Sequence, residues 1–131
     1  MLPQQSRMRR AEDFRRVLRT GRRAGGSALV GHLLLAGPGQ AGSAGAVRSG
    51  DPAKVGFVVS RAVGSAVVRN RVKRRLRELM RGRIASLPEG CLLVLRAQPA
   101  AAGIRQADLA VDLDLVIGRL LRRQVGALRQ E

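Results

Sequence analysis

The sequence contains no tryptophan, no tyrosine and only two phenylalanines, Phe14 and Phe57. Because 45% of the residues are still hydrophobic, alanine, valine and leucine must fill the interior of a folded core. The single cysteine, Cys91, excludes an intrachain disulfide and a cysteine-rich zinc site. Cys91 adjoins the apolar run 92–95, so we predict that it is a buried residue of a strand.

Long hydrophobic runs are missing as well. No stretch approaches the ~20 apolar residues of a membrane-spanning helix. The arginine-rich N-terminus is not followed by the hydrophobic region of a secretory signal. We therefore expect a cytoplasmic protein that has no membrane partner. The length of 131 residues suits a single domain.

Acidic residues are few: the chain has 9 Asp and Glu against 25 Lys and Arg, and its formal net charge is +16. Only Lys54 and Lys73 are lysines. The other cations are arginines, whose planar guanidinium groups grip phosphate in two places and stack on bases. This composition indicates a polyanionic partner such as a nucleic acid.

The acids that are present do not predict a metal-dependent nuclease, which needs clustered carboxylates. The best cluster is Asp108, Asp112 and Asp114, in the predicted last helix. Asp108 and Asp112 share a face in the N-terminal half of that helix, where acidic side chains interact favourably with the helix dipole. We therefore favour helix stabilisation and expect no catalytic residue and no metal ligand. His32, the only histidine, is more typical of a surface or strand residue than of a catalyst.

The most informative segment is 69–77, in which six of nine side chains are cationic. Val72 and Leu76 stand four residues apart and share one face of a helix. This spacing predicts a helix with a narrow apolar stripe and a broad cationic surface. Ser65 is placed to cap the helix by accepting a hydrogen bond from a free amide of the first turn, and we expect the helix to run to about Ile84.

A charged helical face is most often simply solvated, but solvated faces usually mix signs. Here Glu78 is the only acid in residues 52–88. Like charges at i,i+4, such as Arg69 with Lys73 and Lys73 with Arg77, each destabilise an isolated helix by roughly 0.2–0.5 kcal/mol. A polyanion would relieve these repulsions, so a polyanion-binding surface is favoured over a solvated face.

The remaining segments predict one small α+β domain. The predicted elements, in chain order, are helix 11–20, strand 27–36, strand 53–60, helix 65–84, strand 91–96 and helix 105–128. The second strand is expected to run antiparallel to the first. Residues 1–8 are expected to form a flexible basic tail and residues 37–52 a Gly-rich hairpin loop. The order α-β-β-α-β-α indicates a two-layer α+β sandwich, with one small sheet and helices packed on it.

Residues 55–78 hold three motifs in a set order: a Val-Gly-x-x-Val-Ser strand, a Gly-x-Ala-Val turn and a helix that opens Arg-Asn-Arg-x-Lys-Arg. An Arg-x-x-Glu-Asp-Phe-x-x-Val pattern precedes them, ending at Val17, and Arg96-Ala97 follows the third predicted strand. Over about residues 7–121 the chain thus resembles the protein subunit of bacterial ribonuclease P.

The resemblance implies a division of labour. In this family a large RNA cleaves the phosphodiester bond with bound Mg²⁺ and removes the 5′ leader of precursor tRNA, while the protein helps to hold the leader. The expected partners are therefore ribonuclease P RNA and precursor tRNA, with one protein per RNA. The magnesium ions are expected to belong to the RNA subunit, and none to be bound by protein side chains.

The resemblance also implies two binding surfaces. Contacts to the RNA subunit are implied at Arg61, Arg69, Asn70, Arg71, Lys73, Arg74 and Arg77. A cleft for the leader is implied at Phe14, Leu18, Val30, His32 and Val58. For Asn70, a structural role is about as well supported as an RNA contact. For Phe14, core packing is about as well supported as leader binding. Because the family often has aromatic residues where this chain has Leu18 and His32, weaker base stacking is expected here.

Two other functions fit a basic surface of this kind. One is a non-catalytic structural RNA-binding protein of the ribosomal type, and the other is a DNA-binding module that places its basic helix in the major groove. The motifs of residues 55–78 favour the ribonuclease P subunit over both.

Overall fold

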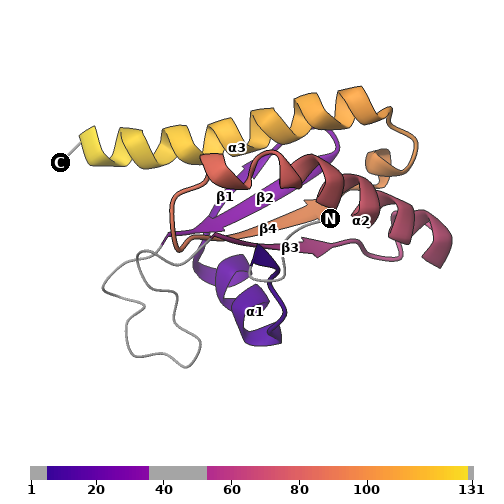
Figure 1. Ribbon diagram of the computed structural model, residues 1–131, viewed down its shortest axis with the longest axis horizontal. Helices are drawn as coiled ribbons and strands as arrows, with labels where there is room; N and C mark the ends of the chain where they lie inside the picture. The colour runs from indigo at the N-terminus through magenta and orange to yellow at the C-terminus, as the bar shows by residue number, and fades with distance from the viewer. Residues whose placement is uncertain (1–5, 36–52, 130–131) are drawn as a thin grey trace.

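The computed structural model describes residues 6–35 and 53–129, with side chains up to residue 122 (Figure 1). In chain order the elements are α1 (Ala11–Thr20), β1 (Arg22–Gly25), β2 (Leu29–Leu34), β3 (Lys54–Val58), α2 (Ala66–Arg81), the short 3-10 helix η3 (Ile84–Ser86), β4 (Leu92–Ala97), the 3-10 helix η4 (Pro99–Ala102) and α3 (Gln106–Arg129). Figure 1 shows α2 and α3 on one side of the sheet and α1 on the other. The predicted α+β class with one small sheet is confirmed, and α1 adds a partial layer on the second face.

The four strands form one sheet in the order β1-β2-β4-β3. β2 pairs antiparallel with both β1 and β4, and β3 pairs parallel with β4. β2 and β3 therefore run in opposite directions, as predicted, but β4 lies between them. Because β2 and β3 are not neighbours, the chain between them does not form a hairpin, and this part of the prediction for residues 37–52 is wrong. Residues 37–52 themselves lie outside the described part.

Strand β1 was not predicted, because Arg22–Gly25 contains no β-branched or aromatic residue. Pairing with β2 over four residues makes it a strand. Gly21 allows the chain to pass directly from α1 into β1. A Cβ atom at Gly21 would lie 2.5 Å from the carbonyl oxygen of Val17, closer than any side chain can come.

The main core fills the space between the sheet and the helices α2 and α3. Alternate residues of β4 face it, so Leu93 and Leu95 are fully buried there. The apolar stripe predicted for the last helix is confirmed, since Leu109, Leu113 and the side chains that follow at helical spacing are buried in the same core. This packing holds α2 with one face against the sheet and the opposite face in solvent.

The buried carboxylate of Asp112 fastens α3 to the turn between β1 and β2. Its Oδ1 atom accepts hydrogen bonds from the backbone N–H of Ser27 at 2.7 Å and from the Ser27 hydroxyl at 3.1 Å. Its Oδ2 atom accepts from the N–H groups of Ala28 and Leu29, at 3.0 and 2.9 Å. The sequence predicted that this carboxylate stabilises the helix through its dipole; the tertiary hydrogen bonds to the β1–β2 turn were not predicted.

The opposite face of the sheet is covered in part by α1 and by the segment before it. Met8 and Val17 are buried there against Leu92 and Val94 of β4. The N–H of Met8 donates to the carbonyl oxygen of Val55 at 3.0 Å, and a parallel bridge joins the neighbouring residue to the same strand. Residues 6–8 are thus held against β3, which contradicts the prediction of a free tail there; residues 1–5 lie outside the described part.

Candidate nucleic-acid interface

The basic helix α2 forms as its sequence predicts. The Ser65 hydroxyl accepts a hydrogen bond from the N–H of Val68 at 3.3 Å, which confirms the predicted cap. Val72 and Leu76 are completely buried, as is Met80 one turn further on. The helix ends at Arg81, three residues earlier than predicted. The apolar stripe therefore faces the core and leaves the cationic positions toward solvent.

We call five cations of α2 the α2 ridge; they are Arg69, Arg71, Lys73, Arg74 and Arg77. Arg71, Arg74 and Arg77 are exposed, whereas Arg69 and Lys73 are half-buried. Asn70 is exposed between them and lines, with Val67, Arg71 and Arg74, a hollow of about 370 Å³. Arg61 is exposed in the turn before the helix. The predicted RNA contacts thus lie on α2 and on the turn before it, and most of them are exposed.

One cation of this segment has a structural task. The side chain of Arg75 donates a hydrogen bond to the carbonyl oxygen of Ile104 at 3.0 Å, in the connection to α3. This contact ties α2 to the segment just before α3.

The acids near α2 lie toward its C-terminal end and leave the ridge uncompensated. Glu78 pairs with Arg81 at 3.3 Å, and Asp114 of α3 pairs with Arg83 at 2.6 Å. The hydrogen bond from Arg83 lowers the pKa of Asp114. Within the described ranges, no ion pair involves a residue of the ridge. A helix N-terminus also carries a partial positive charge, so the ridge is a surface built for anions.

The five predicted leader residues do share one face of the protein, but they differ in exposure. Phe14 and Leu18 lie on α1, and Leu18 is 37% exposed. Val58 lies half-buried on β3. Val30 and His32 of β2 are only 6% and 5% exposed, so they form the floor of this face and offer little surface to a ligand.

The charged form of the His32 imidazole is disfavoured in this floor. Burial lowers its pKa, and the positive charges of Arg96 and Arg23 lower it further. Neither ring nitrogen has a hydrogen-bond partner within the described residues. His32 lies within β2, which is one of the two placements that the sequence suggested for it.

Arg23 and Arg96 belong to the same face, although sequence reasoning did not include them in the site. Arg23 stands directly opposite His32 across the β1–β2 pair. Arg96 stands opposite Val30 on one side and Val58 on the other. Both arginines are exposed. Only the register of the sheet assigns the two arginines to this face. We call it the α1 face; its residues are Phe14, Leu18, Arg23, Val30, His32, Val58 and Arg96.

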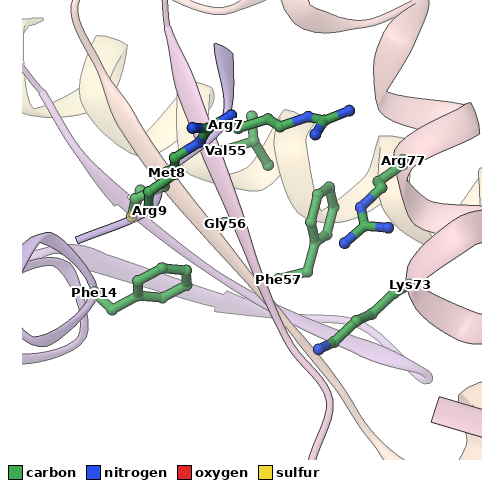
Figure 2. Close-up of a pocket in the computed structure, with 9 residues that line it drawn as sticks. All are labelled: Arg7, Met8, Arg9, Phe14, Val55, Gly56, Phe57, Lys73 and Arg77. Atoms are coloured by element: carbon green, nitrogen blue, oxygen red, sulfur yellow. The ribbon is translucent and has the colours of Figure 1, made fainter. Parts of the chain in front are cut away.

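A pocket of about 210 Å³ at the edge of the sheet connects the two surfaces. We call it the edge pocket; its lining residues are Arg7, Met8, Arg9, Phe14, Val55, Gly56, Phe57, Lys73 and Arg77. Figure 2 shows the Phe57 ring leaning from β3 toward α2, with Lys73 and Arg77 reaching back, while the Phe14 ring lies on the other side of the strand. The sequence did not point to this pocket, because its lining comes from three distant segments.

Gly56 lets the Phe14 ring approach the strand. A Cβ atom at Gly56 would lie 2.4 Å from two carbons of that ring. Any other residue would therefore displace Phe14 from the junction of the α1 face and the edge pocket. Phe14 packs against the second core, which confirms the core-packing role considered for it, and it also lines the pocket.

The described residues show neither a metal-binding cluster nor a membrane-spanning helix. They contain no group of three or more His, Cys, Asp or Glu side chains that could hold a metal ion. In the same part of the chain, no helix combines the length and the apolar character needed to cross a membrane.

Fold and surface together define a small, strongly basic α+β protein with a cationic helix on its surface. The family model for ribonuclease P matches residues 2–121. The ribonuclease P protein component of Streptomyces avermitilis is 54% identical over 126 residues, which cover 92% of this chain and 96% of that protein. The corresponding protein of a Nocardioides species is 48% identical over 120 residues, with 92% and 95% covered. The chain belongs to the ribonuclease P protein family.

Solved structures agree in fold. The ribonuclease P protein of Staphylococcus aureus superimposes with a TM-score of 0.69 at 19% identity, covering 86% of this chain and 93% of that one. The protein from Thermotoga maritima, in complex with 1-(4-fluorophenyl)-2-thiourea, gives 0.66 at 22% identity, covering 87% and 96%. As a family member the chain is the accessory protein subunit of an endoribonuclease that matures the 5′ end of tRNA.

Proposed function

We propose that the α2 ridge binds the catalytic RNA and that the α1 face receives the 5′ leader of precursor tRNA. The observation that carries this assignment is the uncompensated charge of the ridge. Its cations project from a helix whose other face is locked in the core, and no ion pair of the described residues neutralises them. Such a surface gains free energy from each phosphate it contacts, because counterions are released from the RNA.

The α1 face suits a single strand. Phe14 and Leu18 supply partly exposed apolar surface along α1, and Arg23 and Arg96 supply charge across the sheet. Single-stranded nucleic acid is bound by this combination of stacking and charge. Because Leu18 and the buried His32 replace possible stacking rings, Phe14 carries most of the stacking on this face.

The chemistry of cleavage is assigned to the RNA. In this proposal the protein supplies no catalytic group, the Mg²⁺ ions are bound by the RNA subunit, and one protein joins one RNA in the cytoplasm. The acids with the best sequence spacing support this view, since Asp112 and Asp114 are already engaged in tertiary contacts with Ser27 and Arg83.

The ridge can be tested by salt titration of binding to ribonuclease P RNA. Lys73→Ala and Arg69→Ala should each weaken binding and reduce the slope of log K against log salt by about 1, as expected when one phosphate contact is lost. Arg105→Ala is the matched control, because it removes an exposed arginine at the start of α3, outside both surfaces. Ridge variants with the slope of the unmodified protein would contradict the assignment.

Activity gives a second measure of the same proposal. The chain, ribonuclease P RNA and precursor tRNA are combined at low Mg²⁺, and removal of the leader is followed. Cleavage should require both macromolecules and should fall with the ridge variants in parallel with RNA binding. Cleavage by the RNA-free polypeptide would overturn the assignment of chemistry to the RNA.

A further inference from the structure

The edge pocket combines a ring, fixed positive charge and an open strand edge. β3 is the last strand of the sheet, and among the described N-terminal residues Met8 bonds to its outer edge, at the carbonyl oxygen of Val55. Beyond that point the Phe57 ring is half-buried, with one side on the main core and the other toward the pocket. The edge of the sheet thus presents an aromatic surface beside the α2 ridge.

The charges of the pocket come from two directions. Lys73 and Arg77 reach it from α2, one turn apart on the helix, and Arg7 reaches it from the segment that borders β3 (Figure 2). Lys73 and Arg77 repel each other at this i,i+4 spacing, and no ion pair of the described residues relieves the repulsion. A phosphate between them would relieve it.

The size of the pocket limits its ligand. About 210 Å³ is less than the roughly 300–1,000 Å³ of pockets for drug-sized molecules. An aromatic ring beside two cations is the arrangement that binds a base by stacking and its phosphate by charge. Phe14 and Gly56 open the pocket toward the α1 face, whereas Lys73 and Arg77 open it toward the ridge.

We propose that the edge pocket binds one unpaired ribonucleotide, with its base against Phe57 and its phosphate between Lys73 and Arg77. This inference rests on the proposed function, because it requires RNA on the ridge or on the α1 face. The nucleotide belongs to the catalytic RNA or to the precursor leader, which share this chemistry. Phe57 is therefore a recognition residue as well as part of the core.

The test uses Phe57→Leu, which keeps apolar packing against the core but removes the ring face. Phe57→Tyr keeps the ring and should retain binding, and Leu115→Ala, at an exposed site on α3, controls for loss of an apolar side chain. Dissociation constants are measured in three arms. The first is the chain with ribonuclease P RNA. The other two are the holoenzyme with precursor tRNA that carries a long leader and with precursor tRNA whose leader is trimmed to one nucleotide. Circular dichroism and urea titration establish that each variant is folded.

The expected loss for Phe57→Leu is at least about fivefold, the lower end of what base–aromatic stacking contributes. If the loss occurs in binding to the catalytic RNA, the nucleotide belongs to that RNA. If it occurs only with the long leader, the nucleotide belongs to the leader. Equal dissociation constants for Phe57→Leu and the unmodified chain in every arm would overturn the proposal.

A double-mutant cycle with Lys73→Gln tests whether ring and cation bind the same nucleotide. Coupling is expected, so the double variant should lose less affinity than the product of the two single losses. Losses that multiply fully would refute one shared nucleotide. Phe57→Tyr combined with Lys73→Gln is the reference, because it keeps the ring and should show only the loss caused by Lys73→Gln. Failure of the unmodified chain to bind the RNA would instead refute the proposed function.

Discussion

Replacing Asp112 with Asn should destabilise the protein far more than its small change in shape suggests. The carboxylate accepts four hydrogen bonds from Ser27, Ala28 and Leu29, three of them from backbone N–H groups. The amide oxygen of Asn can replace Oδ2 and accept from Ala28 and Leu29. Its NH₂ group then faces the N–H of Ser27, so donor meets donor and one backbone group loses its partner.

The magnitude follows from these contacts. One orphaned N–H costs about 1–3 kcal/mol, and two charge-assisted hydrogen bonds that become neutral lose about 0.5–1.5 kcal/mol each. We expect Asp112→Asn to lower the free energy of unfolding by about 2–6 kcal/mol, out of the roughly 5–15 kcal/mol typical of a domain. Asp112→Ala leaves all three N–H groups without this acceptor and should cost about 3–6 kcal/mol, because water can reach only the exposed Ser27.

The assay is urea unfolding followed by far-UV circular dichroism, since the chain has no tryptophan or tyrosine for fluorescence. Asp108→Asn is the matched control, because Asp108 is exposed one turn earlier on the same helix and should change stability by less than about 0.5 kcal/mol. A urea midpoint for Asp112→Asn equal to that of Asp108→Asn, with an unchanged slope, would show that the hydrogen bonds of Asp112 add nothing to stability.

Three further outcomes are expected. Phe14→Ala should weaken binding of long-leader precursors by about 1–3 kcal/mol and leave mature tRNA unaffected; equal losses would exclude the leader role. Because burial, Arg96 and Arg23 lower the pKa of His32, only the unfolded chain gains a proton as pH falls below the ordinary value of 6.5. Stability should therefore fall there, and less steeply for His32→Leu; identical urea midpoints against pH would argue otherwise. Burial raises the pKa of Cys91 to about 12, so iodoacetamide should label it only after unfolding, and rapid labelling of the native chain would disprove this.

Elements whose signals are local were predicted well. The helix behind the cap of Ser65 has its apolar stripe at Val72 and Leu76, where the 3.6-residue period places it, and the stripe is buried. Short-range rules suffice here because cap, period and charge all act within a few residues of one another.

Elements that depend on distant partners were missed or misplaced. β1 is a strand only because β2 lies beside it. β4 lies between β2 and β3, so these two strands do not form the hairpin that was expected. The segment around Met8 was expected to be free because its charge resembles that of a tail. Its backbone instead bonds to Val55, about 47 residues further along the chain. No local pattern reports such a pairing.

The sequence by itself determined the class of the protein and its basic helix, because composition, helical period and the motifs of residues 55–78 are read along the chain. Only the tertiary structure decided which side chains meet. The register of the sheet brings Arg23 and Arg96 around His32, and the packing of α2 beside β3 brings Lys73 and Phe57 to one pocket. Proximity across a sheet is set by pairing and packing of the whole chain, so it becomes visible only once the core has formed.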